Sequence, residues 1–295
     1  MALDVRIARF SGFCPGVRSA LKMAEKTLSE EGDGGKYTVG PIIHNPIVVK
    51  RLEEEGLHVL PEDPLEWEQI DLEGCTVIIR SHGLGPKAME ELEKRGALII
   101  DATCPIVTKA LRSAKSLVND GYKLVIVGSS THPEVAAIVE HLEGKAVVVS
   151  DPEEAASWLE SEDEIPEMVG VTAQTTISQD SLQAVVDVLH KNVRNLKILN
   201  TLCKTTLKRQ REARKLSRKS DIMLVVGGKN SSNTNYLRLI SEKEGVSAHH
   251  LETAEEIDPA WFQGVNMVGV VGGASTPEDI IDDVIERVKE ISDTL

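Results

Sequence analysis

The feature that most constrains this chain is a threefold repeat in which each unit carries one prominent cysteine. Cys14 and Cys104 are 90 residues apart, and Cys104 and Cys203 are 99 residues apart, in a chain of 295 residues. Similar features follow each cysteine in the same order. Repetition with one thiol per unit predicts three similar domains whose sulfurs meet on a pseudo-threefold axis.

Two polar loops follow each cysteine, and each loop comes directly after an apolar run. The first arrives 28 to 30 residues after the cysteine and the second 68 to 72 residues after it. Side chains from six such loops would surround the three sulfurs, as in an active site. The six positions in register are His44, His132 and Ser231 in the first loop, and His82, Thr175 and Ser275 in the second.

Short β-branched runs alternate with amphipathic stretches along the whole chain, for example KLVIVGSS and PKAMEELEKRG. This alternation is typical of βα units with mostly parallel sheets, in which ligands bind beyond the carboxyl ends of the strands. The sequence therefore predicts an α/β protein of three pseudo-symmetric domains around a central site. Their expected boundaries are 1–103, 104–197 and 198–295.

Composition narrows the class of protein. The net charge of −14 argues against nucleic acid and acidic membranes as partners, because phosphate contacts need a basic surface. No apolar run approaches the ~20 residues of a membrane span, and the N-terminus lacks the pattern of a signal peptide. Four cysteines in so long a chain indicate a reducing cytoplasm. With 3% aromatic residues, we expect a monomer.

Each repeat cysteine stands where a helix should begin. Cys14 and Cys104 are followed by proline, which favours the first helical position, and Cys203 is followed by Lys204. A helix N-terminus favours the thiolate, which is the metal-binding form. A lone free cysteine is more often a small buried hydrophobe, and Cys75, which has no partner in the repeat, is expected in the core.

The number of thiols bears on the metal. Zinc would accept three thiolates with histidine or water as a fourth ligand, but the sequence has no C-x-x-C pair typical of a zinc ribbon. Ferredoxins that transfer electrons usually supply four cysteines to a 4Fe–4S cluster. A cluster held by three would leave one iron free for a substrate oxygen, so three ligands favour a catalytic 4Fe–4S cluster.

The polar loops can be read as an anion site. Neutral imidazoles with serine, threonine and asparagine donors can bind phosphate without arginine. They could also ligate metal, but three sulfurs already supply that role. The remaining histidines are expected to be surface or structural residues: His58, His141, His190, His249 and His250.

Glu134, two residues after His132, is the only carboxylate within this set of loops. In a closed pocket it could move a proton to a leaving hydroxyl, with a pKa raised by burial. The competing interpretation is a solvated carboxylate in the first turn of a helix after Pro133. Asp101, which precedes Ala-Thr-Cys, could cap or orient that loop.

Ten motifs occur in the order found in the LytB family of 4-hydroxy-3-methylbut-2-enyl diphosphate reductases, and the chain resembles that family over nearly its whole length. The motifs are GFCPGV, IIHN, SHG, DATCP, VTK, HPE, QTT, C-x-x-T-x-x-RQ, KNSSN and GAS. The resemblance implies three α/β domains around a 4Fe–4S cluster held by Cys14, Cys104 and Cys203. It implies reductive removal of the substrate hydroxyl at the free iron, which gives isopentenyl and dimethylallyl diphosphates. This is the last step of the methylerythritol phosphate route to isoprenoids.

The resemblance also implies residue roles and partners. Glu134 would deliver protons through a relay with Thr175, and reduced ferredoxin or flavodoxin would supply two electrons. The substrate diphosphate would meet His44, His82, His132, Thr175, Ser231, Ser232, Asn233 and Ser275. Two segments depart from the usual pattern, Lys204-Thr205 and Val271-Gly272, without removing a ligand or donor. They leave room for a changed rate or substrate range.

Two other classes of function remain open: a hydratase that uses the free iron as a Lewis acid, and a non-catalytic iron–sulfur sensor. A structural zinc protein is a weaker third. The stretch from Lys204 to Lys219, with eight Lys/Arg and one Glu, predicts a basic helix. It is either an ordinary solvated helix, which we favour, or a docking face for an acidic electron donor.

Overall fold

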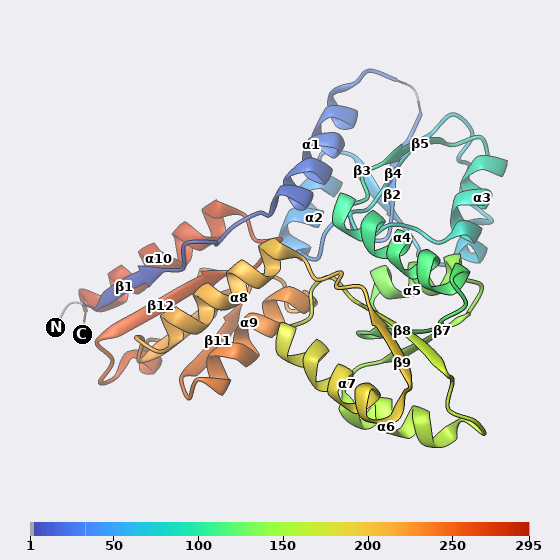
Figure 1. The fold of residues 1–295 in the computed structure, drawn as a ribbon. Helices are drawn as coiled ribbons and strands as arrows, with labels where there is room; N and C mark the ends of the chain where they lie inside the picture. The colour runs from blue at the N-terminus through green and yellow to red at the C-terminus, as the bar shows by residue number, and fades with distance from the viewer. Residues whose placement is uncertain (1–2, 33, 295) are drawn as a thin grey trace. The chain divides into compact units, whose positions relative to one another are not determined.

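The structure is a computed structural model that describes residues 3–32 and 34–294. It contains three four-stranded parallel sheets (Figure 1). Contacts divide the chain into two compact units. Unit 1 consists of Met1–Arg18, Ile43–Arg51 and Lys204–Leu295, and unit 2 consists of Ser19–Ile42 and Leu52–Cys203. The predicted fold class, α/β with parallel sheets, is confirmed.

Unit 2 holds two of the sheets. The first has the order β3-β2-β4-β5 and the second the order β7-β6-β8-β9. Their strands are β2 (Lys36–Val39), β3 (Leu57–Leu60), β4 (Thr76–Ile79), β5 (Leu98–Asp101), β6 (Lys123–Val127), β7 (Ala146–Val149), β8 (Met168–Ala173) and β9 (Asn195–Ile198).

The helices of the first two repeats begin mostly at proline, which suits the first helical position because it has no N–H to leave unpaired. Two of them, α1 (Pro15–Ser29) and α2 (Pro46–Glu54), contain a boundary between the units. The others lie within unit 2: η1 (Pro64–Trp67), α3 (Pro86–Lys94), α4 (Pro105–Asn119), α5 (Pro133–His141), α6 (Pro152–Ser161) and α7 (Gln179–Asn192).

Unit 1 holds the third sheet, with the order β1-β12-β10-β11. Figure 1 shows β1, in blue at the start of the chain, beside β12, in red near its end. The elements are β1 (Asp4–Ile7), α8 (Lys204–Ser217), β10 (Ile222–Val226), α9 (Ser232–Lys243), β11 (Ser247–Leu251), η2 (Ala254–Glu256), η3 (Pro259–Phe262), β12 (Met267–Gly272) and α10 (Glu278–Ser292).

The three sheets share one topology. In each, the first strand after the cysteine pairs with the second and third, and a fourth strand completes the far edge. The fourth strand of the third sheet is β1, with Asp4 paired to Met267 and Ile7 to Val270. Strand pairing therefore places residues 4–7 in the last sheet. The predicted division into 1–103, 104–197 and 198–295 stays a prediction.

The central strands carry the cores. All five residues of β10 are buried, and so are four of the five in β6, because helices cover both faces of a parallel sheet. Each fully buried valine, leucine or isoleucine contributes roughly 1.5–3 kcal/mol. Such sheets form rigid platforms, and the polar loops at the carboxyl ends of the strands are held on them.

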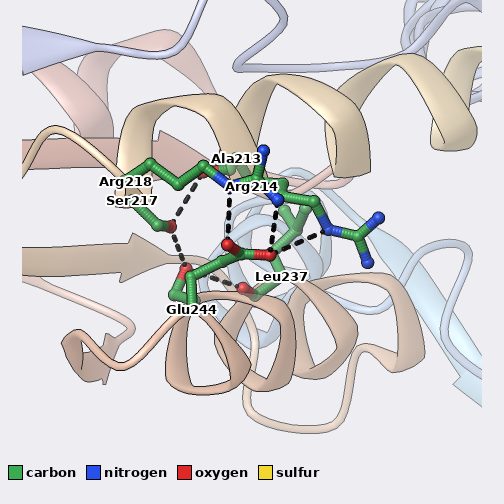
Figure 2. Close-up of polar contacts among 7 residues, drawn as sticks. Ala213, Arg214, Ser217, Arg218, Leu237 and Glu244 are labelled. Carbon is green, nitrogen blue, oxygen red and sulfur yellow. Dashed lines mark hydrogen bonds and ion pairs between the residues drawn. The ribbon is translucent and has the colours of Figure 1, made fainter.

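A polar network joins α8 to α9 within unit 1 (Figure 2). Glu244 accepts from the Nε of Arg218 at 2.7 Å and lies 3.2 Å from the Nε of Arg214. Beside this pair, the hydroxyl of Ser217 donates to the hydroxyl of Ser241 at 3.0 Å. Two basic residues of the predicted basic helix therefore stabilise its packing on α9, which supports the interpretation of α8 as an ordinary helix. The helix ends two residues earlier than predicted, at Ser217.

Among the helices of the described residues, none is both long enough and apolar enough to span a membrane.

Candidate active site

In unit 2, Cys104 and Cys203 are each tied to a neighbouring strand end through the backbone. The N–H of Cys104 donates to the carbonyl of Ser81 at 3.0 Å, and the N–H of Cys203 donates to the carbonyl of Thr175 at 2.9 Å. Cys104 is the N-cap of α4 with Pro105 directly after it, as predicted. Cys203 directly precedes α8 in the chain. Neither residue is in a disulfide, and both are partly exposed.

In unit 1, Cys14 is held in the same way. Its N–H donates to the carbonyl of Ala274 at 3.0 Å. Its sulfur accepts from the N–H of Val17 at 3.4 Å, and its carbonyl accepts from the N–H of Arg18 at 2.9 Å, so the residue caps α1. The carbonyls that anchor the three cysteines lie at equivalent positions, two residues beyond the third strand of each sheet: Ser81, Thr175 and Ala274.

The chemistry of this donor set fits a cluster bound by three thiolates. The three cysteines lie outside any disulfide, are partly exposed and are placed at the start of a helix by equivalent backbone contacts. Exposed amides at a helix start favour a thiolate. Cys75 differs, because it is buried in the core of the first sheet and its thiol donates to the carbonyl of Asp71 at 3.5 Å. The predicted core position of Cys75 is confirmed.

Glu134 is a buried carboxyl held on two sides by Thr175. Its side chain is 1% exposed, in the first turn of α5. One oxygen accepts from the N–H of Thr175 at 2.8 Å, and the other accepts from the Thr175 hydroxyl at 2.7 Å. Burial raises the pKa of Glu134 to about 7, and the two bonds from Thr175 oppose that rise. The residue is therefore a buried acid that titrates near neutrality and not a solvated first-turn carboxylate.

Two of the predicted histidines lie together in unit 2. The rings of His82 and His132 meet edge to face, with centroids 5.5 Å apart. His132 is the N-cap of α5, and its Nδ1 accepts from the N–H of Glu134 at 3.3 Å. A ring nitrogen that accepts a hydrogen bond carries no proton. In a neutral ring the proton of His132 is therefore on Nε2, which can donate to an anion. Unit 2 thus brings together His82, His132, Glu134 and Thr175.

Unit 1 gathers a second polar set at the ends of β10 and β12. The hydroxyl of Ser275 donates to the carbonyl of His44 at 2.9 Å, and Asn45 donates to the carbonyl of Ser275 at 3.0 Å. Ser231 caps α9 by accepting from the N–H of Thr234 at 3.3 Å. Asn45 was not predicted as a site residue, although its place after His44 and before a helix-starting proline is a cap signal.

Asn233 is the residue of this set with the clearest sign of a missing ligand. Together with Ser232 it forms the first turn of α9. Its side chain is 4% exposed, and within the described residues neither its Oδ1 nor its Nδ2 has a hydrogen-bond partner. A buried amide without partners costs about 1–3 kcal/mol, so such groups usually meet a ligand or water. That Asn233 binds an anion stays a prediction.

Arg209 is a buried residue whose role could not be told from the basic pattern of α8. It is 3% exposed, and its guanidinium donates to the carbonyls of Phe10 at 2.6 Å and Gly12 at 2.5 Å. Gly12 has φ 85, a left-handed conformation that favours glycine. Arg209 therefore clamps the turn between β1 and α1, which carries Cys14.

Replacing Arg209 with methionine should destabilise unit 1 by about 3 kcal/mol, because charged hydrogen bonds are lost and buried carbonyls are left unpaired. Urea unfolding of the anaerobic protein measures this. The control is Arg211→Met on the exposed face of the same helix, which should change stability by no more than about 0.5 kcal/mol. Equal effects of the two substitutions would contradict the clamp.

The histidines that were set aside have ordinary structural contacts where the structure records them. His249 stacks on Trp261 with centroids 3.8 Å apart, and the Nε2 of His250 lies 2.8 Å from the carbonyl of Gly227. His58 packs near Tyr37, and His190 is exposed at the end of α7. His141 lies at the end of α5 and lines a cavity described below.

The fold and these loops define the class: an α/β protein of three parallel sheets with one cysteine and two polar loops per sheet. The chain belongs to the LytB protein family, whose profile matches residues 5–289. Relatives named 4-hydroxy-3-methylbut-2-enyl diphosphate reductase include that of Aquifex aeolicus, 43% identical over 98% of this chain and 97% of the relative. The relative of the same name from Geobacter sulfurreducens is 44% identical over 98% of each chain.

Solved structures agree with the family. One is described as (E)-4-hydroxy-3-methyl-but-2-enyl diphosphate reductase, the terminal enzyme of the non-mevalonate pathway. It is 42% identical, with a TM-score of 0.68 over 98% of this chain and all of the other. The E-1-hydroxy-2-methyl-but-2-enyl-4-diphosphate reductase of Plasmodium falciparum is 26% identical, with a TM-score of 0.89 over 97% of this chain and 88% of the other.

Proposed function

We propose that this chain reduces 4-hydroxy-3-methylbut-2-enyl diphosphate to isopentenyl and dimethylallyl diphosphates. The carbon–oxygen bond of the substrate alcohol breaks, and the hydroxyl leaves as water after taking up one proton. Two electrons and a second proton complete the hydrocarbon product. The relatives with this name cover nearly the whole chain, which supports the assignment.

The observation that carries the proposal is the double role of Thr175. Its carbonyl accepts the N–H of Cys203, and its own N–H and hydroxyl hold the carboxyl of Glu134. A single loop residue thereby links a candidate cluster ligand to a buried acid. A proton donor fixed beside an electron-donating centre is what reductive removal of a hydroxyl as water requires.

The remaining polar residues are suited to the diphosphate. His132 presents Nε2 as a donor, and Asn233 has a buried amide that needs partners. Ser231 and Ser275 hold the backbone of these loops through their own hydrogen bonds. We assign the diphosphate to donors from His44, His82, His132, Thr175, Ser231, Ser232, Asn233 and Ser275.

Cys14, Cys104 and Cys203 would hold a 4Fe–4S cluster. When bound, the cluster would supply the electrons and a Lewis-acidic iron with one open coordination position. Reduced ferredoxin or flavodoxin would deliver the electrons from outside. Cysteines that lie outside any disulfide fit a reducing cytoplasm, and we propose that the protein works there as a monomer.

The test is anaerobic turnover. The protein is purified without oxygen, its iron and sulfide are measured, and the substrate is supplied with a chemical reductant and then with reduced ferredoxin or flavodoxin. We expect both five-carbon diphosphates to form, and only when a reductant is present.

Three results would contradict the proposal, each in its own way. Conversion without a reductant would identify a hydratase. An intact cluster that neither binds nor reduces the substrate would indicate a sensor or another anion as ligand. Bound zinc without iron would identify a structural metal protein.

A further inference from the structure

Glu134 poses a problem that its contacts with Thr175 do not solve. If it gives a proton to the leaving hydroxyl, as proposed above, it must regain one before the next turnover. Its side chain is 1% exposed, and both carboxyl oxygens are bonded to Thr175. A return path for the proton must therefore reach it from within the protein.

A cavity of about 240 Å³ in unit 2 reaches Glu134. One wall is a stripe along α5 formed by Glu134, Ala137, Ile138 and His141, which are spaced by three, four and seven residues on one helix face. The stripe runs two turns, about 10 Å, from a buried acid to a histidine at the helix end. Such a length is spanned by about three or four hydrogen-bonded waters.

The opposite walls of the cavity can hold such waters. Val107 and Leu111 of α4 are apolar, while Thr108 on the same helix offers a hydroxyl. Asp101, the last residue of β5, and Thr103, in the loop after it, add further polar groups. Buried water needs two to four polar partners, and here these groups alternate with apolar surface that leaves space.

His141 lies at the outer end of this cavity. A second hollow, of about 850 Å³ and bordered by Glu90, Glu140 and Glu143, opens outside it. Among the described residues that line either space, His141 is the one that lines both. It therefore borders both the cavity beside Glu134 and an outer surface that carries these carboxylates with Lys87, and the carboxylates would attract protons.

The chemistry of His141 suits a relay. Partial burial and the nearby Lys115 lower the pKa of His141. A hydrogen bond to the backbone of Leu84 and the charge of Glu140 raise it by less, so the net effect is a lowered pKa. The ring is therefore neutral near pH 7. With one nitrogen bonded to Leu84, the other can take a proton from one side and release it to the other.

We propose that this cavity and His141 form the route by which protons from solvent return to Glu134. A proton taken up at His141 passes through waters beside Ala137 to Glu134. It restores the protonated carboxyl after Glu134 has given its proton to the leaving hydroxyl. His141 is a relay residue in this scheme and does not touch the substrate.

The experiment blocks the cavity without touching either end of the route. Ala137→Leu adds bulk beside the waters, and Ala136→Leu adds the same bulk to the much larger outer hollow. In anaerobic holoenzyme with full iron content, Ala137→Leu should lower kcat about tenfold or more with KM unchanged. Its solvent deuterium isotope effect on kcat should rise, because proton uptake becomes limiting. Ala136→Leu should match the wild type in both.

A second variant tests the relay itself. His141→Ala should show the same loss of kcat, and added imidazole should restore most of it. An Ala137→Leu enzyme with full iron, unchanged kcat and an unchanged isotope effect would overturn the proposal. So would a His141→Ala enzyme that turns over normally.

A measurement without turnover separates this inference from the proposed function. The infrared carbonyl band of protonated Glu134 is identified as the band missing in Glu134→Gln. After transfer to deuterium oxide, that band should shift more slowly in Ala137→Leu than in the wild type or Ala136→Leu. Equal exchange rates would refute the route even if the enzyme acted on another substrate.

Discussion

Glu134→Gln should lower kcat by about 10²- to 10⁴-fold, the range typical of a removed general acid, while the protein keeps its iron. Glutamine has nearly the same shape and can still accept the N–H of Thr175, but it has no proton to give. Anaerobic steady-state kinetics and iron analysis measure the two quantities. A variant that keeps wild-type turnover would show that Glu134 is not the proton donor.

The same substitution should make the protein more stable at alkaline pH. The pKa of Glu134 is raised from 4.5 to about 7, so folding favours the protonated carboxyl. The contribution of this group to stability is greatest below pH 4.5 and is lost as the pH rises through about 7. Glutamine does not ionise and avoids that loss. The free energy of unfolding of Glu134→Gln, relative to that of the wild type, should therefore be up to about 3 kcal/mol higher at pH 8 than at pH 4.5. Unfolding curves at the two pH values test this.

The pH profile of wild-type activity provides an internal check. Since the protonated form donates, kcat should fall as the pH rises above about 7. Thr175→Val removes the hydroxyl bond that lowers the pKa of Glu134 and keeps the backbone bond. The pH at which kcat falls should therefore be higher in Thr175→Val than in the wild type. A shift in the opposite direction would contradict the inference that the Thr175 hydroxyl lowers the pKa of Glu134.

Cys104→Ser should lose most of its iron and more than about 100-fold in turnover. Substitution of residues that only hold metal ligands in place typically lowers metal affinity or activity by about 10- to 100-fold. The loss of a direct ligand should have a larger effect. Iron and sulfide analysis of anaerobically reconstituted protein, together with turnover, measures the effect.

Cys75→Ser is the matched control. Cys75 is also a free cysteine of unit 2, but it lies in the core and bonds to Asp71. Its replacement should leave iron content unchanged, although some stability is lost because a hydroxyl replaces a thiol in apolar surroundings. Equal iron loss in both variants would point to general unfolding, and full iron in Cys104→Ser would remove that residue from the ligand set.

The repeat pattern predicted the sheets, and it placed the polar loops at strand ends, because cysteine spacing and β-branched runs are local signals. It also predicted the caps at Cys104 and Cys14, since proline after cysteine marks a helix start. The pairing of β1 with β12 was missed. No local sequence pattern tells whether a short strand near the N-terminus pairs with strands that follow it directly in the chain or with strands more than 200 residues later.

Roles that depend on distant contacts were harder to predict. Arg209 looked like one more exposed base on a basic helix, and only its contacts with Phe10 and Gly12 reveal a buried clamp. His141 was set aside as structural because nothing in its neighbours suggests chemistry. Its alignment with Glu134 along α5 becomes meaningful once the cavity between them is known.

The pairing of β1 with β12 also sets an order of events during synthesis. Residues 4–7 are synthesised long before their partners at 267–270. At about 5–20 residues per second, the first strand waits on the order of tens of seconds for its place in a sheet. Until then the turn that carries Cys14 lacks the strand that anchors it. Attachment of the proposed metal cluster to Cys14 in its anchored turn would therefore wait until residues 267–270 have been made.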